Sequence, residues 1–371
     1  MSDFDRVILT GATGAVGAYF VRRLVDEGSP PTVCILRDPN ALERLGRAVG
    51  PEIASRITPV FADLTREDEV LAVTAKLGKS ERSLVLHCAG EVSWTKSERL
   101  AAPINIDGTR RVAQLAVTVS RQTPSLVFLS TAFCSEEHPP RNPYEATKLA
   151  AERLLAAEFA GLVDISIMRC SLVVGTSSDG WMSRFNGLYP LIRILALAEV
   201  PCLIADPDYC VDCVPVDFVW EQAVRAAAMP RPPGQMLRLV AAAGRRAMPL
   251  QSLARLAVGR VDALRRRHQQ PPLPEISILA ERQFRFLMRS SKSWNLSQRF
   301  AKVEEISELM AGYVSHGGSG REIEAIALGG PPPDPAAYMD RVLDFWITCN
   351  ERRVLGARRP DWLLAGEGAG A

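Results

Sequence analysis

A glycine-rich turn near the N-terminus constrains the fold of this chain more than any other feature. Residues 6–10 (RVILT) form a short apolar run, and residues 10–17 (TGATGAVG) follow it directly. The next residues, 15–27, repeat apolar side chains at helical spacing. Glycines between a strand and a helix permit a tight turn and a close approach of the backbone to a phosphate group. The segment therefore predicts a strand and a helix that are joined by a phosphate-binding turn.

The three glycines of this turn have different expected roles. Gly11 allows the tight turn after the strand, Gly14 lets the backbone approach a pyrophosphate, and Gly17 lets the helix pack closely on the sheet. A glycine-rich loop without a ligand is the alternative. We expect the cofactor to be bound here by Thr10, Gly11, Thr13, Gly14, Ala15, Val16 and Gly17.

Apolar runs alternate with helical patterns over the first half of the chain. Strands are expected at 6–10, 32–36, 57–61, 83–87, 125–130 and 164–169, and helices at 15–27, 40–49, 67–77, 105–121 and 144–159. Each strand is almost continuously apolar, as in parallel sheets that are covered by helices on both faces. The pattern predicts an α/β fold, a Rossmann-like doubly wound parallel sheet whose carboxyl edge binds a dinucleotide.

A basic residue, Arg37, ends the predicted second strand, where such folds bind the adenosine ribose. An acid there would bind the ribose hydroxyls of NAD, whereas an arginine suits the extra phosphate of NADP. Arg37 therefore favours NADP(H), with Arg44 as a weaker candidate for the same phosphate. Asp38 follows directly and complicates this interpretation, and a solvated surface arginine is the alternative.

Two further strand ends are expected to line the cofactor site. Asp63 and Leu64 follow the third strand, where the acid would accept from the adenine amine or would instead cap the next helix. His87 ends the fourth strand and is expected to be a packed structural histidine rather than a base. The residues after it are small and leave room for the cofactor backbone: Cys88, Ala89 and Gly90.

Tyr144 and Lys148 lie one helical turn apart and follow Ser130–Thr131 at the end of the predicted fifth strand. A carbonyl that accepts a hydride needs an acid at its oxygen, and tyrosine, with a pKa of about 10, is a reluctant donor at neutral pH. A nearby ammonium and the charge of an oxidised nicotinamide would lower that pKa. We therefore predict that Tyr144 transfers the proton, that Lys148 assists it and binds the nicotinamide ribose, and that Thr131 hydrogen-bonds the substrate oxygen.

The alternation of apolar strands with helical segments stops after residue 175. Residues 1–175 are predicted to form an NADP-binding Rossmann domain, and residues 176–371 a smaller, mainly helical substrate-binding region. Within the latter, 214–241 is expected to return to the sheet through a strand, a helix and a further strand. From about 249 onward the pattern is that of a helical C-terminal extension.

Composition excludes several classes of protein. The net charge of +2 gives no reason to expect nucleic acid, and two prolines and two charged residues interrupt the longest apolar stretch, 188–205, which argues against a transmembrane segment. No secretory leader is recognised at the N-terminus. The eight cysteines are scattered, and the one close pair, Cys210 and Cys213, lacks partners at metal-binding spacing. We therefore expect a cytoplasmic protein without a metal site.

Together these segments resemble the extended short-chain dehydrogenase/reductase family. Within it they are most similar to fatty acyl-CoA reductases and to the thioester-reductase domains of carboxylic acid reductases and peptide synthetases. The resemblance covers roughly residues 5–230 and also rests on 87–94 (HCAGEVSW), 105–109 (NIDGT), 129–132 (LSTA) and 211–217 (VDCVPVD).

The resemblance implies that Thr131, Tyr144 and Lys148 are catalytic, with Asn105 as a helper near the lysine. It also implies that NADPH is the hydride donor and that Cys170, at a position where the family often has proline, lies near the nicotinamide. A thioester carbonyl would accept the hydride and lose thiol to give an aldehyde, and a second round would give an alcohol. The span from Thr131 to Tyr144 is shorter than the family usually has, which leaves the shape of the substrate open.

A basic segment, 260–302, has ten Lys/Arg against three acids. Such a cluster would guide CoA or the phosphopantetheine arm of an acyl carrier protein, and its apolar neighbours would suit an acyl groove or a membrane surface. A solvated helix face over the substrate cleft is the plainer alternative.

Two other functions remain open. An epimerase, dehydratase or hydroxysteroid-type dehydrogenase that acts on a ketone, an alcohol or a sugar nucleotide would share the cofactor half and differ in residues 176–250. The apolar segment 188–197 favours an acyl or polycyclic substrate over a sugar nucleotide. A non-catalytic NADP sensor is the third possibility, and the intact Thr131, Tyr144 and Lys148 argue against it.

Overall fold

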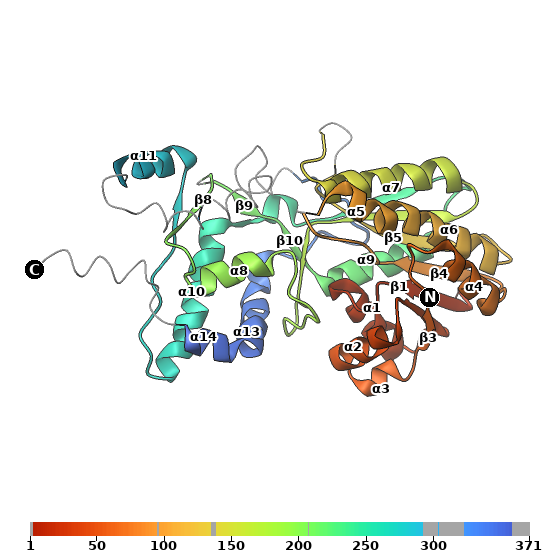
Figure 1. The fold of residues 1–371 in the computed structure, drawn as a ribbon, viewed down its shortest axis with the longest axis horizontal. Helices are drawn as coiled ribbons and strands as arrows, with labels where there is room; N and C mark the ends of the chain where they lie inside the picture. Colours follow the sequence, from red (N-terminus) through yellow and green to blue (C-terminus); the bar gives the residue numbers. More distant parts are fainter. Residues whose placement is uncertain are drawn as a thin grey trace, which may run out of the picture.

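The computed structural model describes residues 3–94, 96–134, 139–206, 208–291, 303 and 323–357. Its centre is a seven-stranded sheet in the order β11-β6-β5-β4-β1-β2-β3, and all of its neighbouring strands run parallel (Figure 1). The strands are β1 (Arg6–Thr10), β2 (Thr32–Leu36), β3 (Thr58–Phe61), β4 (Ser83–His87), β5 (Ser125–Thr131), β6 (Asp164–Cys170) and β11 (Leu237–Ala241).

Helices cover both faces of this sheet, as the sequence predicted. One core contains α1 (Ala15–Asp26), α2 (Pro39–Val49) and α9 (Val216–Ala228), and the other contains α4 (Glu67–Leu77), α6 (Gly108–Val119) and α7 (Pro143–Phe159). Strand β1 shows how alternation divides them, since Val7 and Leu9 belong to the first core and Ile8 to the second. The Rossmann-like doubly wound architecture is confirmed.

Local capping explains where two helices that border the site begin. The Asp38 carboxylate accepts from the Ala41 amide at 2.9 Å at the start of α2, and the Asn142 side chain accepts from the Glu145 amide at 3.0 Å at the start of α7. Both helices have proline at the first position, where the missing N–H costs nothing. These caps fix the start of α7, the helix that carries Tyr144 and Lys148.

A wide helical turn joins α5 (Glu98–Ala102) to α6. Residues Pro103–Asp107 form a π-turn, in which the Gly108 amide bonds to the Pro103 carbonyl five residues back. The helix expected at 105–121 therefore consists of this π-turn at Pro103–Asp107 followed by α6, which ends at Val119. The side chain of Asn105 is buried within this turn.

Beyond β6 the chain leaves the sheet and returns once. Strand β7 (Leu172–Val174) pairs with β10 (Cys213–Pro215) outside the seven-stranded sheet, so the expected strand near 214 does not join it. The sheet instead gains β11, which follows α9 and pairs with β6. Two further short pairs are β9 (Cys210–Val211) with β12 (Met248–Pro249) and β8 (Cys202–Ile204) with β13 (Ser277–Leu279).

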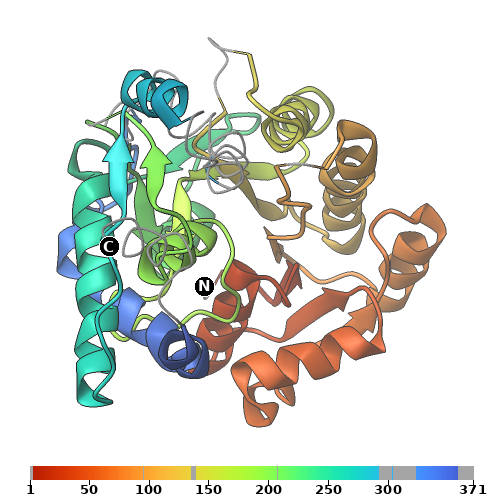
Figure 2. The same ribbon diagram turned by 60° about the vertical axis from the view of Figure 1, so that its left-hand side comes forward.

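Helices of the second half pack beside the sheet rather than apart from it. The elements are α8 (Tyr189–Ala196), α10 (Leu250–Arg267), α11 (Glu281–Ser291), α13 (Met339–Cys349) and α14 (Glu351–Gly356), and the smaller ones are α3 (Pro51–Ala54), η2 (Gly244–Arg246) and η5 (Pro335–Ala337). In Figure 1 helices α8, α10, α13 and α14 lie to the left of β10 and the first half of the chain lies to the right, and Figure 2 shows the same two groups after rotation. The apolar side chains of these four helices continue the core of α1 and α9. A domain boundary at residue 175 remains a prediction.

Candidate active site

A cavity of about 800 Å³ lies at the carboxyl ends of the parallel strands, the edge at which such sheets bind dinucleotides. The loops after six strands, β1 to β6, form one side of it, and residues 184–194 form the other. Of the sequence-predicted site residues, the cavity wall contains Gly11, Thr13, Gly14, Ala15, Val16, Gly17, Arg37, Asp63, Leu64, Cys88, Ala89, Gly90, Thr131, Tyr144, Lys148 and Cys170. Thr10 and Asn105 are not on the wall.

The glycine turn is packed too tightly for side chains at two positions. Gly11 has a φ of +74°, and a Cβ there would lie 2.5 Å from the Ala89 amide nitrogen. A Cβ on Gly17 would lie 2.2 Å from the Gly11 carbonyl oxygen. Gly14 caps α1 and contributes no side chain, so the first N–H groups of the helix point toward the cavity without an intramolecular cap. These open donors and the helix dipole suit an anionic group such as a pyrophosphate.

Thr10 stabilises the turn from behind. Its hydroxyl lies 2.6 Å from Nδ1 of His87, and Nε2 of His87 lies 3.0 Å from the Thr109 hydroxyl. Burial, with a contribution from the charge of Lys148, lowers the pKa of His87 to about 3. His87 is therefore a neutral packed residue, as expected, and Thr10 binds β4 rather than lining the cavity.

Two arginines line the cavity after strand β2, one directly after the strand and one on α2. Arg37 is 66% exposed, and its Nε lies 3.7 Å from a carboxylate oxygen of Asp63. Arg44, on α2, also lines the cavity and lies 3.6 Å from Asp38. Because Asp38 caps α2 and pairs with Arg44, its carboxylate is engaged in structural contacts and is not on the cavity wall. The positive charges of both arginines are thus accessible to a ligand.

Asp63 does not cap the helix that follows it, α4, whose N-cap residue is Arg66. Its carboxylate accepts from the amide and the hydroxyl of Thr65, at 2.9 and 2.8 Å, which is a turn-stabilising arrangement. The residue also lines the cavity beside Leu64. The helix-cap prediction is therefore wrong, and a contact of Asp63 with the adenine amine stays a prediction.

Thr131, Tyr144 and Lys148 converge on the middle of the cavity. Lys148 is buried, and its ammonium donates to the Leu129 carbonyl at 2.8 Å and lies 4.6 Å from the centre of the Phe128 ring. The Tyr144 hydroxyl is hydrogen-bonded to Thr131. A proton donor, its hydrogen-bond partner and an ammonium therefore share one wall.

Burial moves the two titratable groups of this set in opposite directions. It raises the pKa of Tyr144 above its ordinary value, against the smaller lowering effect of the Thr131 hydrogen bond. It lowers the pKa of Lys148 to about 8, against the raising effect of neighbouring thiols and of Glu152. The phenol thus keeps its proton at neutral pH, and the ammonium form of Lys148 predominates below about pH 8.

Asn105 positions the loop that follows β4. Its side chain accepts from the Glu91 amide at 2.8 Å and donates to the Glu91 carbonyl at 3.0 Å and to the Thr147 hydroxyl at 2.9 Å. A Cβ on Gly90 would lie 3.0 Å from Asn105 Oδ1 and 3.2 Å from Lys148 Nζ. Asn105 therefore lies close to Lys148, with its side chain engaged by protein groups.

A buried ion pair lies next to the Thr131–Tyr144–Lys148 set. Glu152 follows Tyr144 and Lys148 at the same four-residue spacing on α7, accepts from the Ser130 hydroxyl at 2.5 Å and binds Nη2 of Arg169 at 2.6 Å. The contacts join β5, β6 and α7 directly behind Thr131. Removal of either charged partner would leave a buried charge, at a cost of about 3–5 kcal/mol. Sequence analysis missed this pair, although the i, i+4, i+8 spacing signalled it.

Apolar and aromatic side chains form much of the remaining wall. The expected apolar segment 188–197 contributes through α8. Residues of the wall that were not predicted from the sequence include Val92, Trp94, Phe133, Leu172, Val173, Arg184 and Phe185. They come from three separate loops and strand β7, which is why no single sequence pattern identified them.

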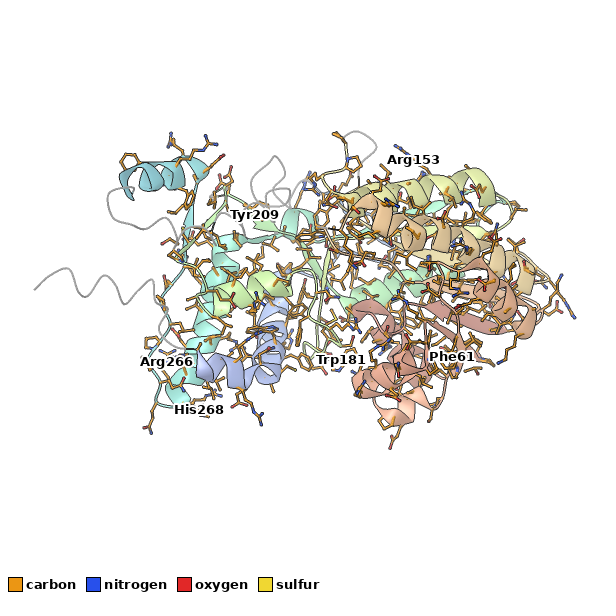
Figure 3. All side chains as sticks on the ribbon, in the orientation of Figure 1. Phe61, Arg153, Trp181, Tyr209, Arg266 and His268 are labelled. Atoms are coloured by element: carbon orange, nitrogen blue, oxygen red, sulfur yellow. The ribbon has the colours of Figure 1, made fainter. Side chains whose placement is uncertain are left out.

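The basic segment 260–302 lies away from this cavity in its described part. Arg266 and His268 mark the far end of α10 (Figure 3). Arg265 is buried and donates to three backbone carbonyls, and Arg260 pairs with Asp344 at 2.6 Å. Three of the ten basic residues lie outside the described residues: Lys292, Arg299 and Lys302.

The described residues contain no helix long and apolar enough to cross a membrane and no cluster of three or more metal-ligating side chains. All eight cysteines are free thiols.

Comparison with known proteins identifies the family. A family profile described as male sterility protein matches residues 9–141 and 135–223, more than half of the chain. The chain belongs to the male sterility protein family. This family binds NAD-type cofactors, and its match spans the glycine turn, the Tyr144–Lys148 helix and the 211–217 segment. The resemblance that the sequence indicated is therefore confirmed.

Relatives of this family member occur in two settings. Isonitrile lipopeptide synthase from Streptomyces coeruleorubidus is 28% identical over 259 residues, which are 62% of this chain and 17% of that protein. Fatty acyl-CoA reductase 1 from Homo sapiens is 24% identical over 280 residues, which are 60% of this chain and 54% of that protein. The chain thus spans a small part of the first and about half of the second.

Solved structures share the fold. The terminal R domain from the myxalamid PKS-NRPS biosynthetic pathway superposes with a TM-score of 0.68 at 17% identity and covers 96% of this chain and 93% of that domain. UDP-glucose 4-epimerase from Thermotoga maritima gives 0.61 at 14% identity and covers 93% and 99%. Because both identities are low, these similarities establish the extended short-chain dehydrogenase/reductase fold alone.

Proposed function

We propose that this chain is an NADPH-dependent reductase that converts an acyl thioester to an aldehyde or an alcohol. One observation carries the proposal: the glycine turn and the Thr131–Tyr144–Lys148 set open into the same cavity, whose remaining wall is largely apolar. A lipopeptide synthase relative and a fatty acyl-CoA reductase relative support the choice of substrate. The apolar wall from α8 favours an acyl group over the sugar nucleotide of the epimerase alternative.

The site residues fit a dinucleotide because the cradle at Gly11 and Gly17 has no room for a Cβ and the start of α1 has open N–H donors. When bound, the cofactor would supply a hydride to the thioester carbonyl carbon. Thr131 would hold the carbonyl oxygen, and Tyr144 would give it a proton as the hydride arrives. The reaction consumes one hydride and one proton and yields an aldehyde and a free thiol. A second hydride and proton would yield the alcohol.

Lys148 acts on this proton transfer through its charge. Its protonated ammonium would oppose the rise that burial gives the pKa of Tyr144, and it would bind the nicotinamide ribose. Asn105, held by Glu91 and Thr147, positions the loop beside that ammonium. Each residue of the set thus has a distinct role.

Free thiol is the product that distinguishes the proposed reaction from its alternatives. We expect acyl-CoA or acyl-pantetheine substrates to oxidise NADPH, with one equivalent of free thiol released per thioester consumed. The absorbance of the reduced cofactor follows the oxidation. Product analysis then counts hydrides per thiol. Turnover of ketones, alcohols or sugar nucleotides without any thioester turnover would instead assign the chain to the dehydrogenase or epimerase class.

Preference for NADPH is proposed to come from Arg37 and Arg44. Changing both to alanine is expected to raise the KM for NADPH by about 10²- to 10⁴-fold, because two charge-assisted contacts with the 2′-phosphate, each worth about 1.5–3 kcal/mol, are lost. The KM for NADH, which lacks that phosphate, should change little. Steady-state kinetics with both cofactors measure the two values.

The matched control for this pair is Arg56→Ala, since Arg56 follows α3 and is absent from the cavity wall. It should leave both KM values unchanged. An equal rise for NADPH and NADH in the double variant would contradict phosphate recognition by Arg37 and Arg44.

The donor of the acyl group is proposed to be CoA or an acyl carrier protein. The relative in Streptomyces coeruleorubidus is a lipopeptide synthase, which favours a carrier-bound thioester, and the human relative is named for acyl-CoA. Exposed arginines at the end of α10, Arg266 and Arg267, belong to the basic segment proposed to attract the phosphate of either donor.

A further inference from the structure

Arg184 is a cation on the cavity wall without a protein partner. It is exposed, lies between β7 and α8, and forms no ion pair or side-chain hydrogen bond within the described part of the chain. The other charged side chains on the wall have such contacts: Arg37 with Asp63, Arg44 with Asp38, Glu91 with Lys96, and Lys148 with the Leu129 carbonyl. A lone guanidinium on a ligand cavity points to an anionic group of the ligand.

The residue before Arg184 contacts the glycine turn. The Ser183 hydroxyl donates to the Gly14 carbonyl at 3.3 Å, and Gly14 is the residue that caps α1. Arg184 therefore leaves the backbone one residue from the point at which a pyrophosphate would meet the helix N-terminus. Residues on both sides of that N-terminus line the same cavity.

Neighbouring aromatic residues fix the backbone around Arg184. The Trp181 ring lies 6.2 Å from the Tyr19 ring, and the Arg22 guanidinium lies 4.3 Å above it, so the loop is attached to α1 at the junction seen in Figure 3. Phe185 packs on Tyr189 of α8 with ring centres 4.8 Å apart. The contacts of Trp181 with α1 and of Phe185 with α8 thus hold the backbone on both sides of Arg184, whose own side chain forms no such contact within the described residues.

We propose that Arg184 binds the pyrophosphate of the dinucleotide from the side opposite the N-terminus of α1. The backbone N–H groups of α1 and the forked guanidinium would then hold the anion between them. The cofactor site therefore extends past residue 175 into the segment predicted to bind only substrate. This inference rests on the cofactor half of the proposed function and not on the identity of the thioester.

Three ligands separate this contact from the others in the cavity. In Arg184→Ala, the dissociation constants of NADPH, NADH and ADP-ribose, which all carry a pyrophosphate, are expected to rise by about 10- to 100-fold. The constant for 2′,5′-ADP, which lacks a pyrophosphate, should change less than about threefold. Arg37→Ala should instead weaken NADPH and 2′,5′-ADP, which carry the 2′-phosphate, and should leave NADH and ADP-ribose nearly unchanged. Calorimetric titration of the thioester-free protein measures all of these values.

Two variants test whether the loss is specific. Arg193, further along the same segment, pairs with Glu199 and is not on the cavity wall. Arg193→Ala should therefore bind every ligand as the unaltered chain does. Arg184→Lys keeps the charge but not the fork and should recover part of the affinity. Thermal unfolding without ligand confirms that each variant is folded.

Two results would overturn the proposal. One is an Arg184→Ala protein that binds NADPH and ADP-ribose as tightly as the unaltered chain. The other is a loss confined to the KM of the thioester, which would assign Arg184 to the phosphate of the pantetheine arm. Because the titrations contain no thioester, failure of the proposed reductase activity would leave their result intact.

Discussion

Tyr144→Phe is expected to lower kcat for thioester reduction by about 10²- to 10⁴-fold, the usual contribution of a positioned general acid. The aromatic ring remains, so the packing of α7 against β5 is retained. The variant loses only the hydroxyl, which is hydrogen-bonded to Thr131 and would protonate the substrate oxygen. The dissociation constant of NADPH should change by less than about twofold. Single-turnover oxidation of bound NADPH measures the chemical step directly.

The matched control is Tyr209→Phe. Tyr209 is another largely buried phenol, with a pKa that burial raises, and it is not on the cavity wall. Its variant should keep the rate of the unaltered chain. If Tyr144→Phe also kept that rate, Tyr144 would not be the proton donor.

Gly17→Ala is expected to weaken NADPH binding by about 100-fold or more and to lower the free energy of unfolding by about 1–3 kcal/mol. A Cβ at this position would lie 2.2 Å from the Gly11 carbonyl oxygen and 3.1 Å from the Ala12 Cα. Both neighbours are backbone, so relief requires α1 to move away from the turn. That movement would displace the N–H groups that face the pyrophosphate. Ligand titration and urea unfolding measure the two effects.

Gly46→Ala is the matched control for this change. Gly46 lies within α2, and a Cβ there would meet only the Ala54 side chain, at 3.8 Å. Because alanine favours a helix by about 1 kcal/mol over glycine, the control should be as stable as the unaltered chain or more stable. An unchanged affinity in Gly17→Ala would show that α1 tolerates the shift and that the turn is not a tight cradle.

The strands of the sheet were predictable because their burial leaves a strong pattern in the sequence. Strands such as 83–87 and 125–131 are buried at every position and therefore read as continuous apolar runs. The pairing of β10 was not predictable, since Cys213–Pro215 is equally apolar but pairs with β7 outside the sheet. Hydrophobic pattern reports burial, and it does not report which neighbour provides it.

The residues of the site were likewise predictable only in part. Residues at the ends of parallel strands were predicted because those ends meet at one edge, and all but Thr10 of the predicted cofactor residues line the cavity. Thr10 was predicted to bind the cofactor but is not on the cavity wall, because the direction of one side chain at a strand end depends on its partner, here His87. Arg184 and Phe185 were missed because their segment has no period, and contacts with α1 and α8 determine their place.

The π-turn at Pro103–Asp107 has a consequence for the chain as a whole. A π-turn is an α-helix with one residue inserted, so deletion of a single residue there would restore regular helical hydrogen bonds between α5 and α6. Each residue of a helix turns by about 100°, and the deletion would rotate Asn105 by that angle away from Glu91 and Thr147. The irregular turn thus gives up helical regularity to hold the loop beside Lys148, and a shorter, more regular helix would release that loop.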